Sequence, residues 1–333
     1  GGLPGAVRRV LAGLGEPVVP AGVRLIGATD VRWGDEWRLF DDEVLWRVGS
    51  APGGWTSMRL EEFEEAFPAV WGRHLERLGA CGPVCARAVA LAVAELGEDT
   101  PVIGFAGAPF TLAAYLVEGR ASRDHLAART LMHADPGAWD ALMTWCARLT
   151  GDFIAAQVRA GASAAQLFDS WAGSLSPADY RARVAPYSAL ALSIARRAVS
   201  PTTGAPAPLI HFGTGTARLL ADMRAAGADA VGVDDRTDLA EAIAVLDGAG
   251  PGPCPVQGNL DPALLAAPWE VLAPAVDACL EAGRAADGHI VNLGHGVPPS
   301  TDPDVLTRIV ARVHGSEEWE RAALAGWDGA AHS

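Results

Sequence analysis

The chain has 333 residues, half of them hydrophobic, and a formal net charge of -14 at pH 7. This length supports a large buried core, no apolar run is long enough to cross a membrane, and the acidic balance argues against nucleic acid and anionic membrane surfaces as partners. All 26 basic residues are arginine, and the lack of lysine excludes Schiff-base aldolases, pyridoxal phosphate enzymes and P-loop nucleotide hydrolases.

The first 85 residues show little regular patterning. They hold five of the eleven tryptophans and nine of the 26 arginines. Val23–Trp33 fits one apolar strand with Asp30 near its end, and Leu60–Leu78 carries apolar residues at helical spacing despite Pro68. Enrichment in Trp, Gly and Arg is what GC-rich DNA read in a wrong frame would encode. We therefore treat residues 1–85 as a divergent N-terminal segment whose correct translation is an open question.

From about residue 100 onward, short apolar strands alternate with amphipathic helices. The pattern predicts strands over Val102–Phe105, Ala164–Phe168, Leu209–Phe212, Ala230–Val233, Pro255–Gly258 and His289–Leu293. It predicts helices over Trp139–Ala160, Pro177–Ala198, Ala217–Ala226, Leu239–Leu246, Trp269–Ala282 and Pro303–His314. An Asp or Ser directly before Pro predicts an N-terminal cap at Asp135, Ser176, Asp261 and Asp302.

Six βα units in a row favour a parallel sheet. The fold class we predict is α/β, as a (β/α)8 TIM-type barrel with its active site at the carboxyl ends of the strands. A doubly wound sheet is the alternative, although the Gly-rich nucleotide turn expected after its first strand does not occur in the sequence. Residues 1–85 offer one plausible strand, one fewer than an eight-stranded barrel needs, so the barrel is predicted with its N-terminal strands incomplete.

The most informative stretch is Gly104–Gly119, where an apolar strand runs into a Gly-Ala-Pro turn and then a helix with a single tyrosine. Small residues at a strand end let a ligand approach backbone amides, and the next helix N-terminus favours anionic groups. Taken alone, the stretch is more simply a tight turn that needs glycine for its geometry. Five further motifs follow at strand ends: Gln166–Gly173, His211–Thr216, Gly232–Arg236, Val256–Pro262 and Val291–Gly296.

In their order and spacing these six motifs resemble the uroporphyrinogen decarboxylase family over about residues 86–314, in a form typical of a high-GC bacterium. The resemblance implies cofactor-independent decarboxylation of the four acetate side chains of uroporphyrinogen III to give coproporphyrinogen III in haem biosynthesis. Protonation of a pyrrole carbon would make the ring its own electron sink, so no metal, pyridoxal or thiamine is implied. Binding the many substrate carboxylates suits arginine forks.

Three residues match positions that contact substrate in the family: Tyr115, Ser170 and His295. Tyr115 lies one turn into its helix and would offer its hydroxyl to a carboxylate, with a core tyrosine as the ordinary alternative. Ser170 would donate to a propionate, or else serve as a cap or turn serine. His295 lies between two glycines at the end of the last strand, where we favour carboxylate binding over a structural role.

Other polar residues at the strand ends carry weaker predictions. Arg236 is the one basic residue at a matching strand end, and it would meet a propionate or else form a solvated ion pair. Asp169 and His211 would shape the cleft or hydrogen-bond neighbouring loops. Asn259 and Asp261 would fix a turn, with Asp261 as the cap before a proline.

The resemblance fails in residues 1–85. Family members open with a strand carrying Arg-Gln-Ala-Gly-Arg, and a second strand ends in Phe-Ser-Asp, whose Asp lies beneath the macrocycle. Neither motif occurs here, so the catalytic carboxylate is unknown and Asp30 is only a weak candidate. Asp235 also replaces the family's usual Trp, and would repel a polyanion unless Arg236 or a proton offsets its charge. A mis-assembled gene start, a homologue with altered chemistry and a homologue without catalysis all remain open.

Two other functions need weighing. A corrinoid-dependent methyltransferase on the same barrel would need zinc held by thiolate and imidazole at the strand ends. Cys254 instead precedes its strand, and the last two strands end in Asn259 and His295 without a neighbouring cysteine, so no metal site is predicted. A catalytically impaired tetrapyrrole-binding homologue would keep Tyr115, Ser170 and His295 but lack the substrate arginines and central Asp.

The chain divides into residues 1–85, a barrel over 86–314, and a C-terminal tail over 315–333. The five cysteines are odd in number and scattered, which fits free thiols in a reducing cytoplasm. The resemblance implies a homodimer and a small-molecule tetrapyrrole substrate, with no nucleic acid and no membrane as partners.

Overall fold

The computed structural model describes residues 81–97, 100–119, 122–250 and 252–315, together with four short strands nearer the N-terminus. It divides into two compact units. The first comprises Gly1–Val84 and Ala113–Leu142, and the second comprises Cys85–Leu112 and Met143–Ser333. We describe each unit by itself.

The first unit contains a small antiparallel sheet. Its strands are β1 (Val23–Leu25), β2 (Trp37–Phe40), β3 (Glu43–Val48) and β4 (Trp55–Arg59), and β3 pairs with each of the others. The strand predicted over Val23–Trp33 is confirmed for its first three residues, which pair antiparallel with β3. Asp30 and the helix predicted over Leu60–Leu78 lie outside the described residues.

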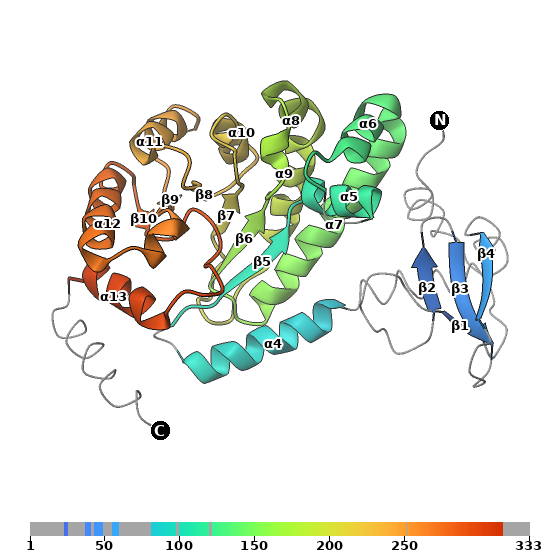
Figure 1. Ribbon diagram of the computed structural model, residues 1–333, viewed down its shortest axis with the longest axis horizontal. Coiled ribbons are helices and arrows are strands. Elements are labelled where there is room, and N and C mark those ends of the chain that lie inside the picture. The colour runs from blue at the N-terminus through green and yellow to red at the C-terminus, as the bar shows by residue number, and fades with distance from the viewer. Residues whose placement is uncertain are drawn as a thin grey trace. The chain divides into compact units, whose positions relative to one another are not determined.

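The second unit is built on a six-stranded parallel sheet with the order β10-β9-β8-β7-β6-β5. Figure 1 shows helices α8 to α13 arranged around the outside of this sheet. The strands are β5 (Ile103–Gly107), β6 (Ala164–Phe168), β7 (Leu209–Phe212), β8 (Ala230–Gly232), β9 (Val256–Gln257) and β10 (His289–Ile290).

Helices connect successive strands. The α-helices are α4 (Cys81–Leu96), α5 (Pro109–Glu118), α6 (Leu126–Ala134), α7 (Pro136–Arg159), α8 (Pro177–Arg183), α9 (Ala185–Ala195), α10 (Leu220–Ala225), α11 (Leu239–Asp247), α12 (Trp269–Gly283) and α13 (Pro303–Val313). Two short 3-10 helices, η1 (Ala172–Ser174) and η2 (Pro262–Ala266), follow β6 and β9. Among the described residues, no helix combines the length and apolar character needed to span a membrane.

The four predicted N-terminal caps are confirmed. The carboxylate of Asp135 accepts the amide of Ala138 at 3.0 Å, and Ser176, Asp261 and Asp302 each accept a backbone amide in the first turn of the element that follows. A side-chain acceptor at this position satisfies a donor that the helix itself leaves without a partner.

The helix predicted as continuous over Pro177–Ala198 is instead two helices, α8 and α9, which break at Val184. Pro186 lies in the first turn of α9. Because proline has no N–H and its ring clashes with the preceding turn, it is accepted at a helix start and rejected in a helix interior.

The side chains of the sheet separate into an outer and an inner set. Leu167 and Leu209 face the helices and pack in a core cluster with Ile154 and Leu192. On the inner face, the Gln257 amide donates to the Gln166 side chain at 3.0 Å, although β7 and β8 separate their strands. Three strand spacings in a flat sheet are about 14 Å, so this contact shows that the sheet curves around its inner face.

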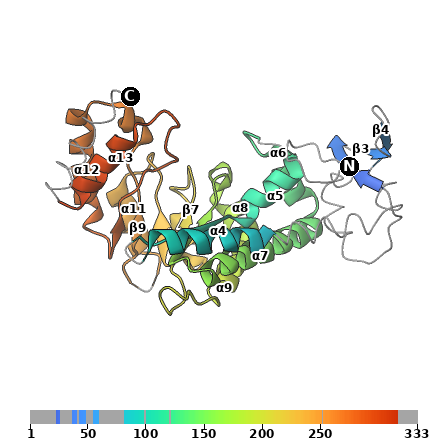
Figure 2. The ribbon, with the colours of Figure 1, turned by 90° about the horizontal axis from the view of Figure 1, so that it is seen from below.

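Helix α4 lies across the amino-terminal end of this sheet (Figure 2). Its Val93 lies next to Gly161, at the turn that leads into β6, since a Cβ atom at that glycine would be 3.2 Å from a Val93 methyl group. This helix was not predicted from the sequence. It covers the end of the sheet opposite to the loops that carry the predicted site residues.

The predicted α/β barrel class is confirmed. Each new strand adds on the same side of the previous one, whereas a doubly wound sheet reverses its order at a switch point. Within the described residues the sheet has β5 and β10 as edges and does not close. The curved, sequentially built sheet places the ends of β6 to β10 at one rim.

Candidate active site

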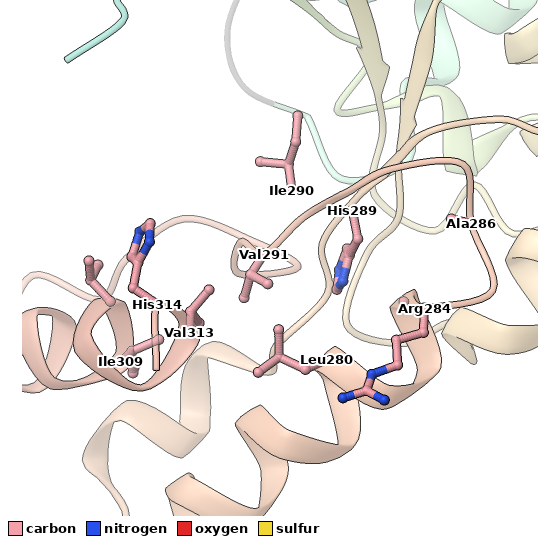
Figure 3. A pocket seen from close by; sticks show the side chains of 11 residues that line it. Leu280, Arg284, Ala286, His289, Ile290, Val291, Ile309, Val313 and His314 are labelled. Atoms are coloured by element: carbon pink, nitrogen blue, oxygen red, sulfur yellow. The ribbon is translucent and has the colours of Figure 1, made fainter. Parts of the chain in front are cut away.

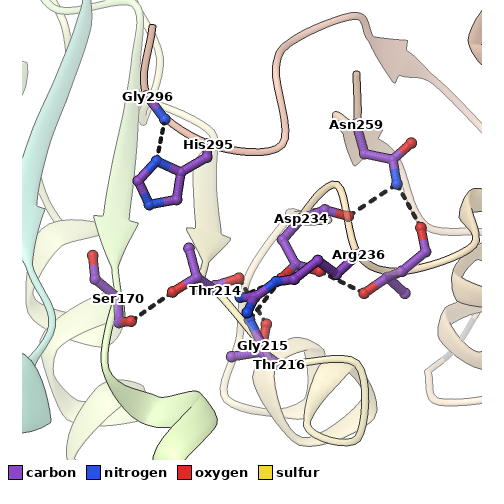
Figure 4. Close-up of polar contacts among 11 residues, drawn as sticks. Ser170, Thr214, Gly215, Thr216, Asp234, Arg236, Asn259, His295 and Gly296 are labelled. Carbon is purple, nitrogen blue, oxygen red and sulfur yellow. Dashed lines mark hydrogen bonds and ion pairs between the residues drawn. The ribbon is translucent and has the colours of Figure 1, made fainter. Parts of the chain in front are cut away.

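The loops after β6 and β7 are in close backbone contact. The Thr214 hydroxyl donates to the carbonyl oxygen of Ser170 at 2.7 Å (Figure 4). Only glycine fits at position 173, because a Cβ atom there would clash with the Thr214 carbonyl oxygen at 2.3 Å. Ser170 itself is partly buried and is not the cap of η1, whose N-cap is Trp171. The turn is therefore held by its backbone and by Thr214, and the Ser170 side chain is not needed as a cap.

A buried carboxylate organises the next loop. Asp234, just after β8, accepts the amide of Gly215 at 2.7 Å and the hydroxyl of Thr237 at 2.6 Å. Its Oδ2 also accepts Arg236 Nε at 3.1 Å and pairs with Nη2 at 3.0 Å (Figure 4). The Asp234 side chain is 1% exposed, whereas that of Arg236 is 64% exposed. Asp234 thus holds one edge of a guanidinium on a largely exposed side chain.

The loops after β9 and β10 join the same group. Asn259 donates from its amide nitrogen to the carbonyl oxygens of Asp234 at 3.0 Å and Thr237 at 2.6 Å. Gly294 packs directly on the Asp235 backbone, since a Cβ atom there would lie 2.0 Å from the Asp235 nitrogen. The ends of five neighbouring strands, β6 to β10, are therefore tied together by short contacts.

His295 follows Gly294 and is exposed at this rim (Figure 4). Its Nδ1 accepts the backbone amide of Gly296 at 2.7 Å. Because that nitrogen is an acceptor, the neutral imidazole carries its proton on Nε2. His295 therefore presents a hydrogen-bond donor, which suits a carboxylate.

Of the predicted site residues, Ser170, Arg236 and His295 lie on loops that the structure brings together. Tyr115 belongs to the first unit, on α5, where it is 48% exposed. A wholly buried core tyrosine, the alternative reading, is therefore wrong for this residue. The prediction of a solvated ion pair for Arg236 is correct on the arginine side, but its partner Asp234 is buried and was given no role in the sequence analysis.

Asp169 and His211 do not line the rim, because both side chains are wholly buried. His211 is in register with Leu167, and it lies two residues from Leu209, so it faces the helices. The prediction that these two residues shape the cleft is wrong. The alternative, hydrogen bonds to neighbouring loops, is not shown for their side chains either: Asp169 accepts one hydrogen bond, from Thr111 on α5, and within the described residues neither ring nitrogen of His211 has a hydrogen-bond partner.

A pocket of about 660 Å³ lies between α12, β10 and α13 (Figure 3). It is lined mainly by apolar side chains, together with those of His289, His314 and Arg284. None of the predicted site residues contributes to it.

Among the described residues, no three His, Cys, Asp or Glu side chains come together as a metal site. The described thiols are Cys85, which is half-buried, and the buried Cys146, Cys254 and Cys279, and all four are free.

The fold is shared with a methyltransferase from Methanosarcina mazei, with a TM-score of 0.58 over 70% of this chain and 64% of that one. At 19% sequence identity this likeness defines the barrel-type fold alone. Residues 73–316 match the family described as Uroporphyrinogen decarboxylase (URO-D), and the chain belongs to that family.

Close relatives carry the same description. Proteins named uroporphyrinogen decarboxylase from Arthrobacter sp. (strain FB24) and Leifsonia xyli subsp. xyli (strain CTCB07) are each 60% identical to this chain, over 227 and 237 residues. Each match covers 68% of this chain and 62% of the relative. One from Nocardioides sp. (strain ATCC BAA-499 / JS614) is 51% identical over 74% of this chain and 65% of its own length. The chain thus spans about three fifths of the length of these curated relatives.

Proposed function

We propose that this chain binds uroporphyrinogen III and removes carbon dioxide from its four acetate side chains to give coproporphyrinogen III. Membership of the family and identities of up to 60% support the reaction class. The observation that carries the proposal for this chain is the convergence of Ser170, Arg236 and His295 on loops joined at one rim.

Each of these three side chains offers a donor that suits a carboxylate. The Nε2–H of His295 and the hydroxyl of Ser170 are neutral donors, and they would orient one substrate side chain by single hydrogen bonds. The Arg236 guanidinium adds a positive charge and a planar pair of donors, which suits a propionate. For Tyr115, on α5 in the first unit, the family resemblance alone supports a role in substrate binding.

The charge of Asp235 next to the site opposes a polyanionic substrate. Its neighbour Arg236 is held by Asp234, so one positive charge stays close to this loop in a fixed position. We propose that Arg236 offsets the repulsion that Asp235 causes. The carboxylate beneath the macrocycle is unknown, and Asp30, which lies outside the described residues, is only a weak candidate for it.

We further propose that the chain acts in the cytoplasm as a homodimer. The free thiols among the described cysteines support a reducing compartment. Light scattering after size-exclusion chromatography tests the dimer, and a mass of one chain, near 34.5 kDa, would refute it.

The proposal is tested by comparing matched arginine variants. Arg236→Gln removes the charge at the rim, and Arg284→Gln removes another exposed arginine, one that pairs with Glu281 on α12. Binding of coproporphyrin, a stable four-carboxylate porphyrin, is followed by fluorescence. We expect Arg236→Gln to weaken binding by about tenfold, as for a charge-assisted hydrogen bond, and Arg284→Gln to leave it unchanged. Equal effects of the two changes would contradict the proposed site.

A further inference from the structure

Five polar side chains form a buried cluster behind the strand end that carries Ser170. They are Thr111 on α5, Asp169 after β6, Tyr180 on α8, Ser188 on α9 and His211 on β7. Thr111 is 7% exposed and the other four are 0% exposed. All five belong to the second unit. The proposed reaction uses none of them, although buried polar groups are costly unless they serve one another as partners.

Asp169 lies at the centre of the cluster. Its Oδ1 accepts the Thr111 hydroxyl at 3.5 Å, and its Oδ2 lies 3.6 Å from His211 Nε2. Burial and the nearby Asp169 carboxylate raise the pKa of Tyr180 well above its ordinary value, so its hydroxyl stays protonated. Thr111, Tyr180 and His211 thus lie around one carboxylate, although within the described residues Asp169 Oδ2, His211 Nε2 and the Tyr180 hydroxyl have no hydrogen-bond partner.

The Asp169 backbone is fixed as well. Its amide donates to the Phe212 carbonyl oxygen at 2.7 Å, and its carbonyl oxygen accepts the Ala172 amide at 3.1 Å. The next residue is Ser170, whose carbonyl oxygen is held by Thr214. Asp169 and Ser170 are therefore joined by a peptide with hydrogen bonds on both sides, to Phe212 and to Thr214.

We propose that Asp169 is a positioning residue for the substrate-binding Ser170, and that His211 holds the Asp169 carboxylate by donating from Nε2. This inference rests on the proposed function, because Ser170 is assigned to substrate there. An apolar side chain at position 169 could pack in several orientations, whereas a carboxylate makes directional contacts. These contacts would hold the turn that carries Ser170 in a single orientation.

A double-mutant cycle tests the coupling between the two residues. Asp169→Asn keeps the side-chain shape and removes the charge, and it is made alone and in the Ser170→Ala background. The readouts are coproporphyrin affinity and, with uroporphyrinogen under anaerobic conditions, KM and kcat. Asp277→Asn, at an exposed ion pair with Arg312, is the matched control. If Asp169 acts through Ser170, Asp169→Asn weakens affinity about tenfold alone but less than about threefold when Ser170 is already truncated.

Equal effects of Asp169→Asn in both backgrounds overturn the inference and leave the proposed function standing. If the unaltered chain binds no coproporphyrin, the proposed function is refuted and the inference falls with it. Should Asp169→Asn not fold, Thr111→Val and His211→Gln enter the same cycle with the same expectations.

Nitrogen-15 NMR of the histidines tests the pairing without any ligand. We expect the Nε2 signal of His211, which lies 3.6 Å from Asp169 Oδ2, to shift when Asp169→Asn removes the neighbouring charge. A His211 signal that the substitution leaves unchanged overturns the pairing.

Discussion

Replacing Gly294 by alanine tests whether the rim is held together by backbone contact. A Cβ atom at this position would lie 2.0 Å from the nitrogen and 2.6 Å from the Cα of Asp235. Backbone atoms cannot rotate away as a flexible side chain can, so the loops after β8 and β10 must separate. Gly296→Ala is the matched control on the other side of His295, because a Cβ atom there meets nothing within 4 Å.

The magnitude follows from this geometry. Overpacking of this kind costs about 1–3 kcal/mol, and a domain of this size loses about 2–4 °C in Tm for each kcal/mol. We therefore expect Gly294→Ala to lower Tm by about 2–12 °C. Gly296→Ala should leave Tm unchanged or raise it slightly, because alanine reduces the entropy of the unfolded chain by about 0.4–1 kcal/mol where the backbone accepts it.

Two assays test whether the contact between Gly294 and Asp235 holds the rim together. Calorimetry gives Tm, and fluorescence titration gives coproporphyrin affinity at a temperature where both variants are folded. We expect Gly294→Ala to weaken binding and Gly296→Ala to retain it. If both variants are as stable and bind as tightly as the unaltered chain, the rim does not depend on the contact between Gly294 and Asp235, and the reasoning is refuted.

Three further predictions concern stability. Ile154→Ala removes a wholly buried side chain of the core cluster and should cost about 2–5 kcal/mol, measured by denaturant unfolding; a loss below that of Ile154→Val would contradict the packing. Asp302→Ala removes the cap of α13 and should cost about 1 kcal/mol, with Asp302→Asn retaining most of it. The hydrogen bond from Arg312 lowers the pKa of Asp277, so this pair stabilises the fold above the carboxyl's ordinary pKa and the contribution is lost as pH falls through the lowered value. Asp277→Asn should therefore flatten the acid side of the Tm-against-pH curve, and an unchanged curve would refute the pairing.

Strand positions could be predicted from the sequence because their apolar runs are short and end in small or polar residues. β6 and β7 match their predicted bounds, Ala164–Phe168 and Leu209–Phe212, at both ends. The break at Val184 also has a local signal, Pro186, which the helical spacing of apolar residues obscured. Short-range sequence features, namely apolar runs, small or polar residues at their ends and proline, thus specify most of the strands and helices.

The contacts that build the site could not be predicted in the same way. Gly294 and Asp235 are far apart in the chain, and only the curvature of the sheet brings their loops together. For His211, near a strand end, the sequence left open whether it shapes the cleft or hydrogen-bonds neighbouring loops. Its register with Leu167 turns it towards the helices instead. A shift of one residue along a strand moves a side chain to the other face, and the sequence alone did not decide between the two.

The role of Asp234 was missed although a signal for it was present. An acidic residue two positions before an exposed arginine, at a strand end, is able to hold that arginine in place, as the structure shows for Asp234 and Arg236. In the sequence the pair was indistinguishable from an ordinary solvated charge cluster, because the burial of the carboxylate depends on loops from two other strands.

The central claim is that this chain decarboxylates uroporphyrinogen. The most direct measurement incubates the purified chain with uroporphyrinogen III without oxygen, oxidises the products, and counts their carboxylates by chromatography. The account predicts porphyrins with seven to four carboxylates, and loss of turnover in His295→Asn. A chain that neither converts nor binds the substrate would contradict it, while binding without conversion would leave a tetrapyrrole-binding protein and refute the decarboxylase.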